Sequence, residues 1–494
     1  MQHSPPTVAY PLDKSDGPAR RSSAAFGQAV VVEALRAADP AAADAAAREP
    51  DWRKGYLRHF RALIEAGLTG PNHAIATAGP NHAIATAGPT GSDHAIATAG
   101  LAAVHERMCF LTGDVETSLD EALEADPDRP LETVTVAGTG QPERELTLPY
   151  RGEMLRGAKI DHRLDAWVAS GVLEPSAAEA VREVARHPDW LDLSDQRLVV
   201  LGAGAEMGPL PALLGWGGTV VGIDLPRPEL WARIRATAEA SAGRLITPAG
   251  GDVPGADLLS DLAAVAGWLR GLDGRLILGN YVYAPGAAYP RLSAAVDALS
   301  LHLRRHRDDV GLAFLATPTD VFAVPGEAVA QATARYHARS RRARVAAALS
   351  GHRLLRPNYP DGAEPGVNDS LVAQQGPNYA LAKRIQRWRA TIARPGGLVS
   401  LSVAPPTRTR SVTSNRLLAA AYAGAHLFDV EVFDPSTANK LLAVLLIHQI
   451  RNPRPPAAQA WPDEANAAVH GGLWRTAYHP RTALGLAAIR GLVG

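Results

Sequence analysis

Cysteine is nearly missing from this chain of 494 residues, because Cys109 is the only one it contains. A single thiol cannot form an internal disulfide or a cysteine-based zinc cluster, and such scarcity is typical of a reducing compartment. Net charge is missing as well, since 50 Lys and Arg residues balance 50 Asp and Glu residues. The composition therefore gives no reason to expect a nucleic acid or an anionic membrane as a partner.

Long apolar runs are also missing. The longest run, from Leu441 to Ile447, is far too short to cross a bilayer. The first residues are polar and include prolines, without the apolar centre of a secretory signal. Together with the single cysteine, these features predict a cytoplasmic protein that does not enter a membrane.

Lysine is scarce, with only five examples among the 50 cationic residues. One of them, Lys383, follows Tyr379 by four residues, so on a helix the two side chains would share a face. A nearby ammonium lowers the pKa of a phenol, and such a phenol can exchange a proton with a carbonyl or an alcohol. We therefore take Tyr379 and Lys383 as a candidate catalytic pair.

A glycine-rich turn lies upstream, between two apolar segments that read as buried strands. The first segment is 197–201, and the second ends in Asp224, 22 residues after Gly202. Gly202, Gly204 and Gly208 form the turn, and a helix is expected from 209 to 216. Glycines let a backbone approach a pyrophosphate, and an acid about 20 residues later can bind a ribose diol. The pattern predicts a nucleotide site.

Apolar strands and helical patterns continue to alternate after Asp224. The expected strands are 245–247, 275–280, 311–317 and 397–403, and the clearest helices are 257–269 and 291–306. Alternation of this kind predicts a doubly wound parallel sheet, which is a Rossmann-like α/β fold. We expect a mostly helical N-terminal extension to precede it.

From residue 197 to about residue 452, the chain resembles the short-chain dehydrogenase/reductase family. The resemblance places Gly202 and Gly208 on the family's glycine turn, and Tyr379 and Lys383 on its catalytic pair. It implies hydride transfer between a nicotinamide and a carbonyl or alcohol, with Tyr379 as general acid/base. The other cofactor positions that it implies are Asp224 for the ribose, Asp252 for the adenine, Asn280 in the Asn-Ala-Gly segment, and Thr407 and Thr409 for the nicotinamide.

The resemblance also implies a cofactor and a small-molecule substrate. Asp224 favours NAD, since a carboxylate repels a 2′-phosphate, while Arg227 keeps NADP open. Helices that flank such sheets often pair subunits, so a homo-oligomer is expected as an option. No metal site is predicted.

The chain departs from the family pattern at several positions. Glu206 replaces the middle glycine of the turn, where its charge would repel a pyrophosphate unless it turns away. The serine that the family keeps after its fifth strand is absent, which leaves Thr317, Thr319 or Ser370 to orient the substrate oxygen. On the helix after the fourth strand, His302 is the polar residue near the family's proton-relay position.

These departures leave two alternatives. One is an S-adenosylmethionine-dependent methyltransferase, because the stretch from Val199 to Asp224 fits its nucleotide turn almost as well. The other is a Rossmann-like scaffold that binds without catalysis, which Glu206 and the missing serine support.

The expected organisation has four parts. They are a disordered segment 1–25, a mostly helical region 26–190, a dinucleotide-binding domain 191–455 and a tail 456–494. A nine-residue repeat occupies 71–100, and an insertion at about 320–375 interrupts the binding domain. The repeat, in which His73, His82 and His94 recur, is more simply a duplicated loop than a metal site.

Overall fold

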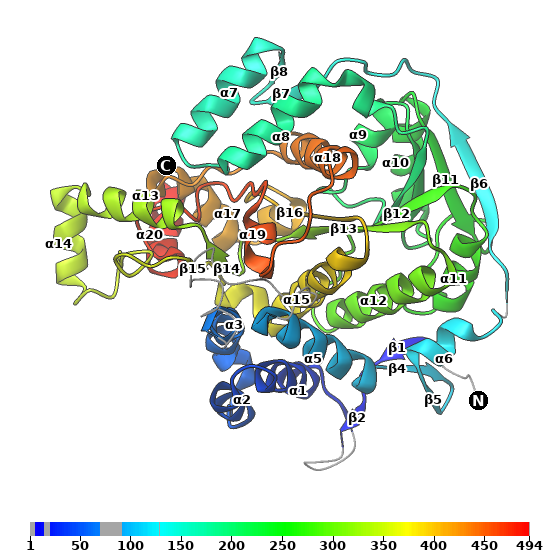
Figure 1. The fold of residues 1–494 in the computed structure, drawn as a ribbon, viewed down its shortest axis with the longest axis horizontal. Helices are drawn as coiled ribbons and strands as arrows, with labels where there is room; N and C mark the ends of the chain where they lie inside the picture. The colour runs from blue at the N-terminus through cyan, green and yellow to red at the C-terminus, as the bar shows by residue number, and fades with distance from the viewer. Residues whose placement is uncertain (1–4, 14–19, 70–90, 128, 494) are drawn as a thin grey trace, which may run out of the picture.

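A mostly parallel sheet of seven strands forms the centre of the protein, in a computed structural model that describes residues 5–13, 20–69, 91–127 and 129–493 (Figure 1). Six strands are parallel, and the seventh pairs antiparallel at one edge. Numbered along the chain, the parallel strands lie in the order 3-2-1-4-5-6, which is known from dinucleotide-binding sheets. The order across the sheet is β16 (Val399–Val403), β13 (Val310–Ala316), β12 (Arg275–Asn280), β9 (Gln196–Leu201), β10 (Thr219–Ile223), β11 (Arg244–Ala249) and β6 (Glu132–Ala137).

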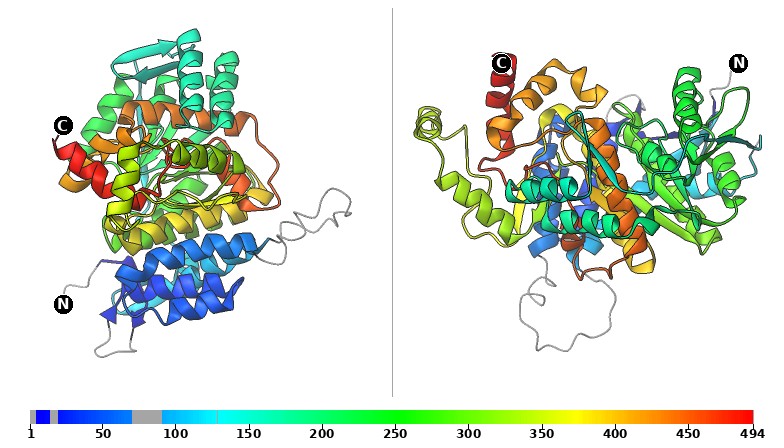
Figure 2. Two further views of the ribbon diagram at one scale, coloured as in Figure 1. Left: turned by 90° about the vertical axis from the view of Figure 1, so that its left-hand side faces the viewer. Right: turned by 90° about the horizontal axis from the view of Figure 1, so that it is seen from above.

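Helices cover both faces of this sheet, as the expected α/β fold requires (Figures 1 and 2). The continuous apolar strands are buried on both sides because their alternate side chains enter different cores. Val199 and Leu201 of β9 belong to one core, whereas Leu198 and Val200 belong to the other. One face carries α9 (Leu210–Gly215), α10 (Pro228–Glu239) and α18 (Pro435–Arg451), and the other carries α11 (Leu262–Arg270), α12 (Ala288–His306) and α15 (Gly376–Ala393).

A further helical layer lies outside each face. On the side of α18 this layer is α7 (Ala158–Ala169) and α8 (Pro175–Arg186). On the side of α15 the N-terminal helices pack against α12 and α15 (Figure 1). These helices are α1 (Ser23–Arg36), α3 (Trp52–Thr69) and α5 (Ser92–Arg107), and α2 (Pro40–Ala47) packs on α1 and α3.

Two of the sequence predictions concern the N-terminal region. Part of the segment 1–25, which was expected to lack structure, forms β1 (Thr7–Ala9), and β1 pairs with β4 (Cys109–Thr112) because Val8 is buried there. The third copy of the repeat, 92–100, begins α5, while the copies within 71–88 lie outside the described residues. The neighbouring elements are β2 (Leu12–Asp13), β3 (Arg20–Arg21), β5 (Val115–Ser118) and α6 (Leu119–Glu124).

The insertion and the tail complete the fold. The insertion stands out at one side of the molecule and includes a two-stranded antiparallel pair (Figure 1). Its elements are β14 (Val321–Val324), α13 (Gly326–His337), α14 (Arg341–Leu349) and β15 (Gly366–Asp369). The remaining elements are β7 (Thr147–Tyr150), β8 (Glu153–Arg156), α16 (Arg410–Thr413), α17 (Arg416–Gly424), α19 (Ala460–Ala465), α20 (Pro480–Val493) and the short 3-10 helices Pro188–Leu191, Ala373–Gln375, Arg394–Gly396 and Ala425–Phe428.

Among the described residues, every helix is too short or too polar to serve as a membrane span.

Candidate functional site

The carboxyl ends of the parallel strands gather the predicted residues at one edge of the sheet. Gly202 follows β9, Asp224 follows β10 and Thr317 follows β13, while Asn280 ends β12. The chain runs from β9 outward to β11 and then returns to β12 on the other side of β9. Ligands of open α/β sheets bind at such a switch of direction, outside the carboxyl ends of the strands. The candidate site therefore centres on β9 and β12.

The glycine turn needs glycine for steric reasons at Gly202, and at Gly204 it lies close to α10. Gly202 has a φ of +84°, and a Cβ atom there would lie 2.9 Å from the Tyr281 carbonyl oxygen. A Cβ atom at Gly204 would lie 2.4 Å from Leu230 Cδ1 of α10. Both positions thus allow a close approach of neighbouring segments, which is one of the roles that glycines have in nucleotide turns.

Asp224 holds this turn in place. Its carboxylate accepts a hydrogen bond from the Gly204 N–H at 2.9 Å and another from the Leu225 N–H at 2.8 Å. A carboxylate has about four acceptor positions, so two remain for ribose hydroxyls. The loop after β11 folds over the same residue, with the Ala256 N–H 2.9 Å from the Asp224 carbonyl oxygen. Asp252, in that loop, is exposed.

Glu206 turns toward the segment that follows β16. Its carboxylate accepts hydrogen bonds from the backbone N–H of Arg410 at 2.8 Å and from Arg410 Nε at 2.9 Å. The charge that would repel a pyrophosphate is therefore paired, and the ion pair links the glycine turn to α16. Thr409 precedes Arg410 and shares a hydrogen bond with Ser411, while the buried Thr407 hydroxyl donates to Pro405.

Asn280 presents a buried polar atom that lacks a partner. The residue is 3% exposed, and its Oδ1 atom makes no hydrogen bond within the described residues. An unpaired buried acceptor costs about 1–3 kcal/mol, and such costs in native proteins are often met by a ligand or a water molecule. This atom lies at the carboxyl end of β12, beside the turn after β9.

Tyr379 and Lys383 lie on α15, the helix between the fifth and sixth parallel strands. Lys383 Nζ donates to the Leu315 carbonyl oxygen of β13 at 3.0 Å and to Gln386 Oε1 at 3.2 Å. The Tyr379 phenol hydrogen bonds with Thr317, and its ring packs 5.6 Å from the ring of Tyr289. The helix thus brings three of the four predicted catalytic residues to the end of β13.

The protonation of this pair differs from the sequence expectation. Burial lowers the pKa of the Lys383 ammonium to about 8. Burial raises the pKa of the Tyr379 phenol, and the hydrogen bond with Thr317 offsets only part of this rise. The prediction that Lys383 lowers the pKa of Tyr379 is therefore wrong, because the ammonium is directed at the Leu315 carbonyl oxygen of β13. Tyr379 is a neutral phenol near pH 7, and so a proton donor.

Two other predicted residues lie apart from this pair. Ser370 is buried, and its hydroxyl donates to Asn368 Oδ1 at 2.6 Å, so it is committed within the insertion. His302 belongs to the last turns of α12, which lead to the start of β13 and hence to the opposite edge of the sheet. The sequence alone could not show at which end of the sheet His302 lies, because that depends on the residue at which its helix begins.

A buried network of charges, which the sequence analysis missed, fixes α15 against the loop after β13. Asp320 accepts from Arg384 at 2.8 Å and from Arg387 at 2.6 Å, and Arg387 also binds Glu464 of α19 through two hydrogen bonds. Asp320 follows Thr317 by three residues, so the network positions the Thr317 hydroxyl relative to Tyr379. The two arginines, three residues apart on the helix with Tyr379 and Lys383, were the available signal.

A cavity of about 550 Å³ lies close to the candidate site. Tyr422 of α17 lines it, and the same residue acts electrostatically on Tyr379. Arg408, from the segment after β16, lines it too, together with Arg335 and Glu431. This volume is within the range of pockets that hold small molecules.

The chain matches none of the protein-family models with which it was compared, and no curated protein is significantly similar to it.

Proposed function

We propose that this protein is an NAD(P)-dependent oxidoreductase of the short-chain dehydrogenase/reductase type. One observation carries the proposal. The helix between the fifth and sixth parallel strands brings Tyr379, Lys383 and Thr317 together at the carboxyl end of β13. A proton donor at that edge lies on the side of the sheet where dinucleotides bind in folds with this strand order. The cofactor would supply or accept the hydride.

The residues at the strand ends fit a dinucleotide. The turn from Gly202 to Gly208 would receive the pyrophosphate, and the free acceptor positions of Asp224 would bind the adenosine ribose. Asn280 Oδ1 would gain the hydrogen-bond partner that it lacks among the described residues. An ammonium has three N–H donors, and Lys383 uses two of them on Leu315 and Gln386, so the third can bind a ribose hydroxyl.

Tyr379 would transfer the proton. In the direction of reduction its neutral phenol donates to the substrate carbonyl oxygen, and Thr317 orients the two oxygens by hydrogen bonding. With a pKa of about 8, Lys383 is protonated in about nine of ten molecules at pH 7. The ammonium therefore keeps its third N–H donor for the cofactor ribose.

The neighbouring cavity would hold the substrate. Its lining combines tyrosine rings with both cationic and acidic side chains, among them the Arg408–Asp434 pair, which suits a bulky carbonyl compound with polar groups. Tyr422 lines this cavity and interacts electrostatically with Tyr379, so we expect one end of such a molecule to lie near the phenol.

A binding scaffold without catalysis remains the second candidate. The observation that favours it is the ion pair between Glu206 and Arg410, which links the glycine turn to α16 on the side where a pyrophosphate would enter.

Calorimetric titration with NADH, NADPH and S-adenosylmethionine tests the proposal. We expect micromolar binding of one nicotinamide cofactor, and at least tenfold weaker binding to Asp224→Asn, which keeps the size of the side chain but not its charge. Asp361→Asn, in the exposed part of the insertion, is the matched control and should bind as the wild type does. Binding of S-adenosylmethionine alone would favour methyl transfer, and binding of none of the three would favour the scaffold.

Turnover is then measured with a panel of carbonyl compounds. Tyr379→Phe should bind the cofactor with unchanged affinity and lose activity by about 10²–10⁴-fold, which is the usual contribution of a positioned general acid. Activity that survives this substitution would remove Tyr379 from the mechanism.

A further inference from the structure

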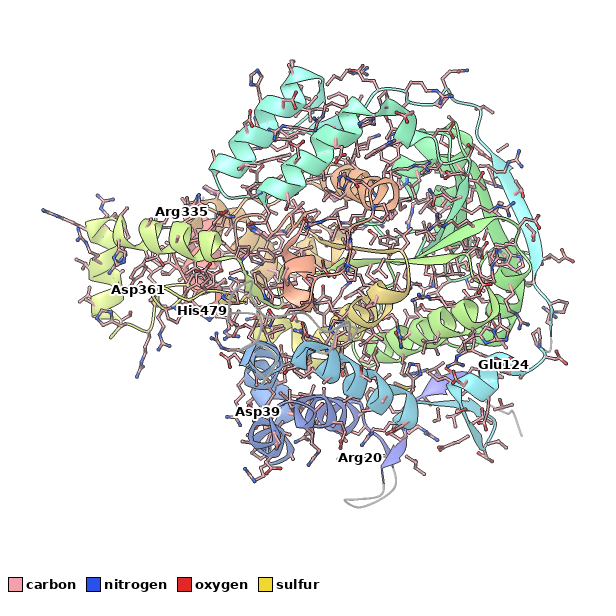
Figure 3. The ribbon with its side chains drawn as sticks, in the orientation of Figure 1. Arg20, Asp39, Glu124, Arg335, Asp361 and His479 are labelled. Atoms are coloured by element: carbon pink, nitrogen blue, oxygen red, sulfur yellow. The ribbon has the colours of Figure 1, made fainter. Side chains whose placement is uncertain are left out.

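Three possible metal ligands converge at the amino ends of the parallel strands, opposite the candidate site. His302 and His306 lie four residues apart on the last turns of α12, and Glu124 ends α6. Figure 3 labels Glu124, at the end of the short helix that packs beside α12. One nitrogen from each imidazole and one carboxylate oxygen all lie within 4.8 Å of one another. Side chains four residues apart share a helix face, which explains how one helix supplies two of the three groups.

The two nitrogen-to-oxygen distances are close to those around a small tetrahedral ion. His302 Nδ1 lies 3.2 Å from Glu124 Oε1, and His306 Nε2 lies 3.6 Å from the same oxygen. Zinc bonds of about 2.0–2.1 Å, set at tetrahedral angles, separate the ligand atoms by about 3.3 Å. An ion could therefore enter between the three groups with small side-chain movements.

The hydrogen bonds leave ring nitrogens available for such an ion. His306 Nδ1 lies 2.8 Å from the His302 carbonyl oxygen, so it carries the proton and Nε2 keeps its lone pair toward Glu124. A hydrogen bond from the other ring nitrogen to a carbonyl is the usual way in which proteins orient a metal-binding histidine. His302 is 1% exposed, and Nδ1 is the ring nitrogen that faces Glu124, so Nε2 would carry the proton of the metal-bound ring.

The surrounding charges permit a cation here. Arg270 and Arg305 act on His302 and would oppose a positive ion. Arg305, however, is paired with Asp120 of α6 at 3.2 Å. Glu124 itself contributes a negative charge and is 51% exposed, so an ion can arrive from solvent.

We propose that Glu124, His302 and His306 bind one zinc ion, with a water molecule as the fourth ligand. Two imidazoles and one carboxylate are a recurrent zinc set, and the chain offers no thiolates at this place. The ion fastens α6, which belongs to the N-terminal part of the chain, to α12 of the central domain. This site is independent of the proposed oxidoreductase function, because it lies at the amino ends of the parallel strands and the candidate site lies at their carboxyl ends.

The test begins with full-length protein that has been treated with a chelator and then titrated with ZnCl₂ in a calorimeter. We expect one equivalent to bind with micromolar or tighter affinity and to raise the thermal midpoint by several degrees, since a ligand of the folded state stabilises it. Cobalt should bind at the same place and give the visible absorption of a four-coordinate ion. If no zinc binds, the three side chains form only a hydrogen-bonded cluster and the proposal fails.

Two variants locate the ion. Glu124→Gln and His306→Gln alter partly exposed side chains, so both proteins should fold, and each should weaken zinc binding at least tenfold and remove the thermal shift. His337→Gln is the matched control, because His337 faces one carboxylate, Asp361, in an exposed pair to which the described part of the chain adds no third ligand. Its zinc affinity should equal that of the wild type.

A second control concerns the duplicated segment, whose histidines could also capture zinc. The double variant His73→Gln, His82→Gln should keep the full equivalent. Loss of zinc from this variant, with unchanged binding by Glu124→Gln, would overturn the proposal.

Discussion

Lys383 is a cation held in a place that disfavours its charge. Its Nζ atom donates to the Leu315 carbonyl oxygen of β13, and burial lowers the pKa of the ammonium to about 8. Proteins commonly accept such a cost where a residue serves a function, so its replacement often increases stability. The two hydrogen bonds of the ammonium offset part of the cost but do not remove it.

Replacement of Lys383 by Met should therefore raise the free energy of unfolding at pH 7 by about 1–2 kcal/mol. The folded pKa of about 8 lies below the ordinary 10.5, so the unfolded chain binds more protons between these two values. The wild type consequently gains stability as the pH rises from about 8 to 10.5, and the advantage of the variant should disappear over that range. Urea denaturation of both proteins at pH 7 and pH 10.5 measures this difference. A variant less stable than the wild type at pH 7 would contradict the argument.

At the scale of elements, the position of α15 depends on charges rather than on apolar packing alone. Asp320, Arg384, Arg387 and Glu464 are all buried, and together they join the loop after β13 to α15 and α19. Removal of one member of a buried set leaves its partners charged and without compensation.

Asp320→Ala should accordingly lower the free energy of unfolding by about 3–5 kcal/mol. Glu239→Ala is a suitable control, because Glu239 and Arg235 form an exposed pair at 3.7 Å, and its loss should cost less than about 1 kcal/mol. Denaturant titrations of the two variants provide the comparison. Similar losses in both would mean that the buried network does not hold the helix.

The sequence predicted elements better than it predicted their contacts. The expected strand 275–280 coincides with β12, since a short apolar run bounded by turns has few other solutions. Within the region 26–190, which was expected to be mostly helical, α1 is separated from α2, where Asp39 caps a new helix that starts at Pro40. Proline after a capping residue was a readable signal for that break.

Only two parts of the candidate site could be predicted from the sequence: the residues at the strand ends, and the pair Tyr379 and Lys383 on one helix. Asp224 and Asn280 reach the same end of the sheet because parallel strands all end there, and Tyr379 lies in the first turn of α15. The pairing of Glu206 with Arg410 joins residues 204 positions apart, and it depends on how loops fold over the sheet. No local pattern encodes a contact of that kind.

For the whole molecule, a buried cluster ties the outer helical layer to the tail. Glu174 caps α8, accepts from His470 Nε2 at 2.9 Å and binds Arg475 through two hydrogen bonds. Burial alone would raise the pKa of Glu174, but the hydrogen bonds from these partners hold it at about 2. His470 is therefore a structural residue, and the two glycines that follow it let the chain turn around its ring.

Acid should loosen this cluster in a defined range of pH. The folded pKa of about 2 lies below the ordinary 4.5, so the contribution of Glu174 is complete above pH 4.5 and is lost as the pH falls toward 2. Glu174→Gln should be less stable than the wild type by about 3 kcal/mol at pH 7, and the difference should shrink below pH 4.5. Glu179→Gln, an exposed site on α8, is the control. A difference that stays constant down to pH 2 would exclude this linkage.

The edge strand β6 has a consequence for the newly made chain. It pairs with β11, so residue 132 meets residue 249, more than a hundred residues later in the sequence. During synthesis β6 leaves the ribosome long before its partner exists, and an unpaired strand is a site where chains aggregate. Its residues Glu132, Thr133 and Thr135 remain mostly exposed even in the finished sheet. Polar side chains thus alternate with apolar ones along much of the strand that must wait longest for its neighbour.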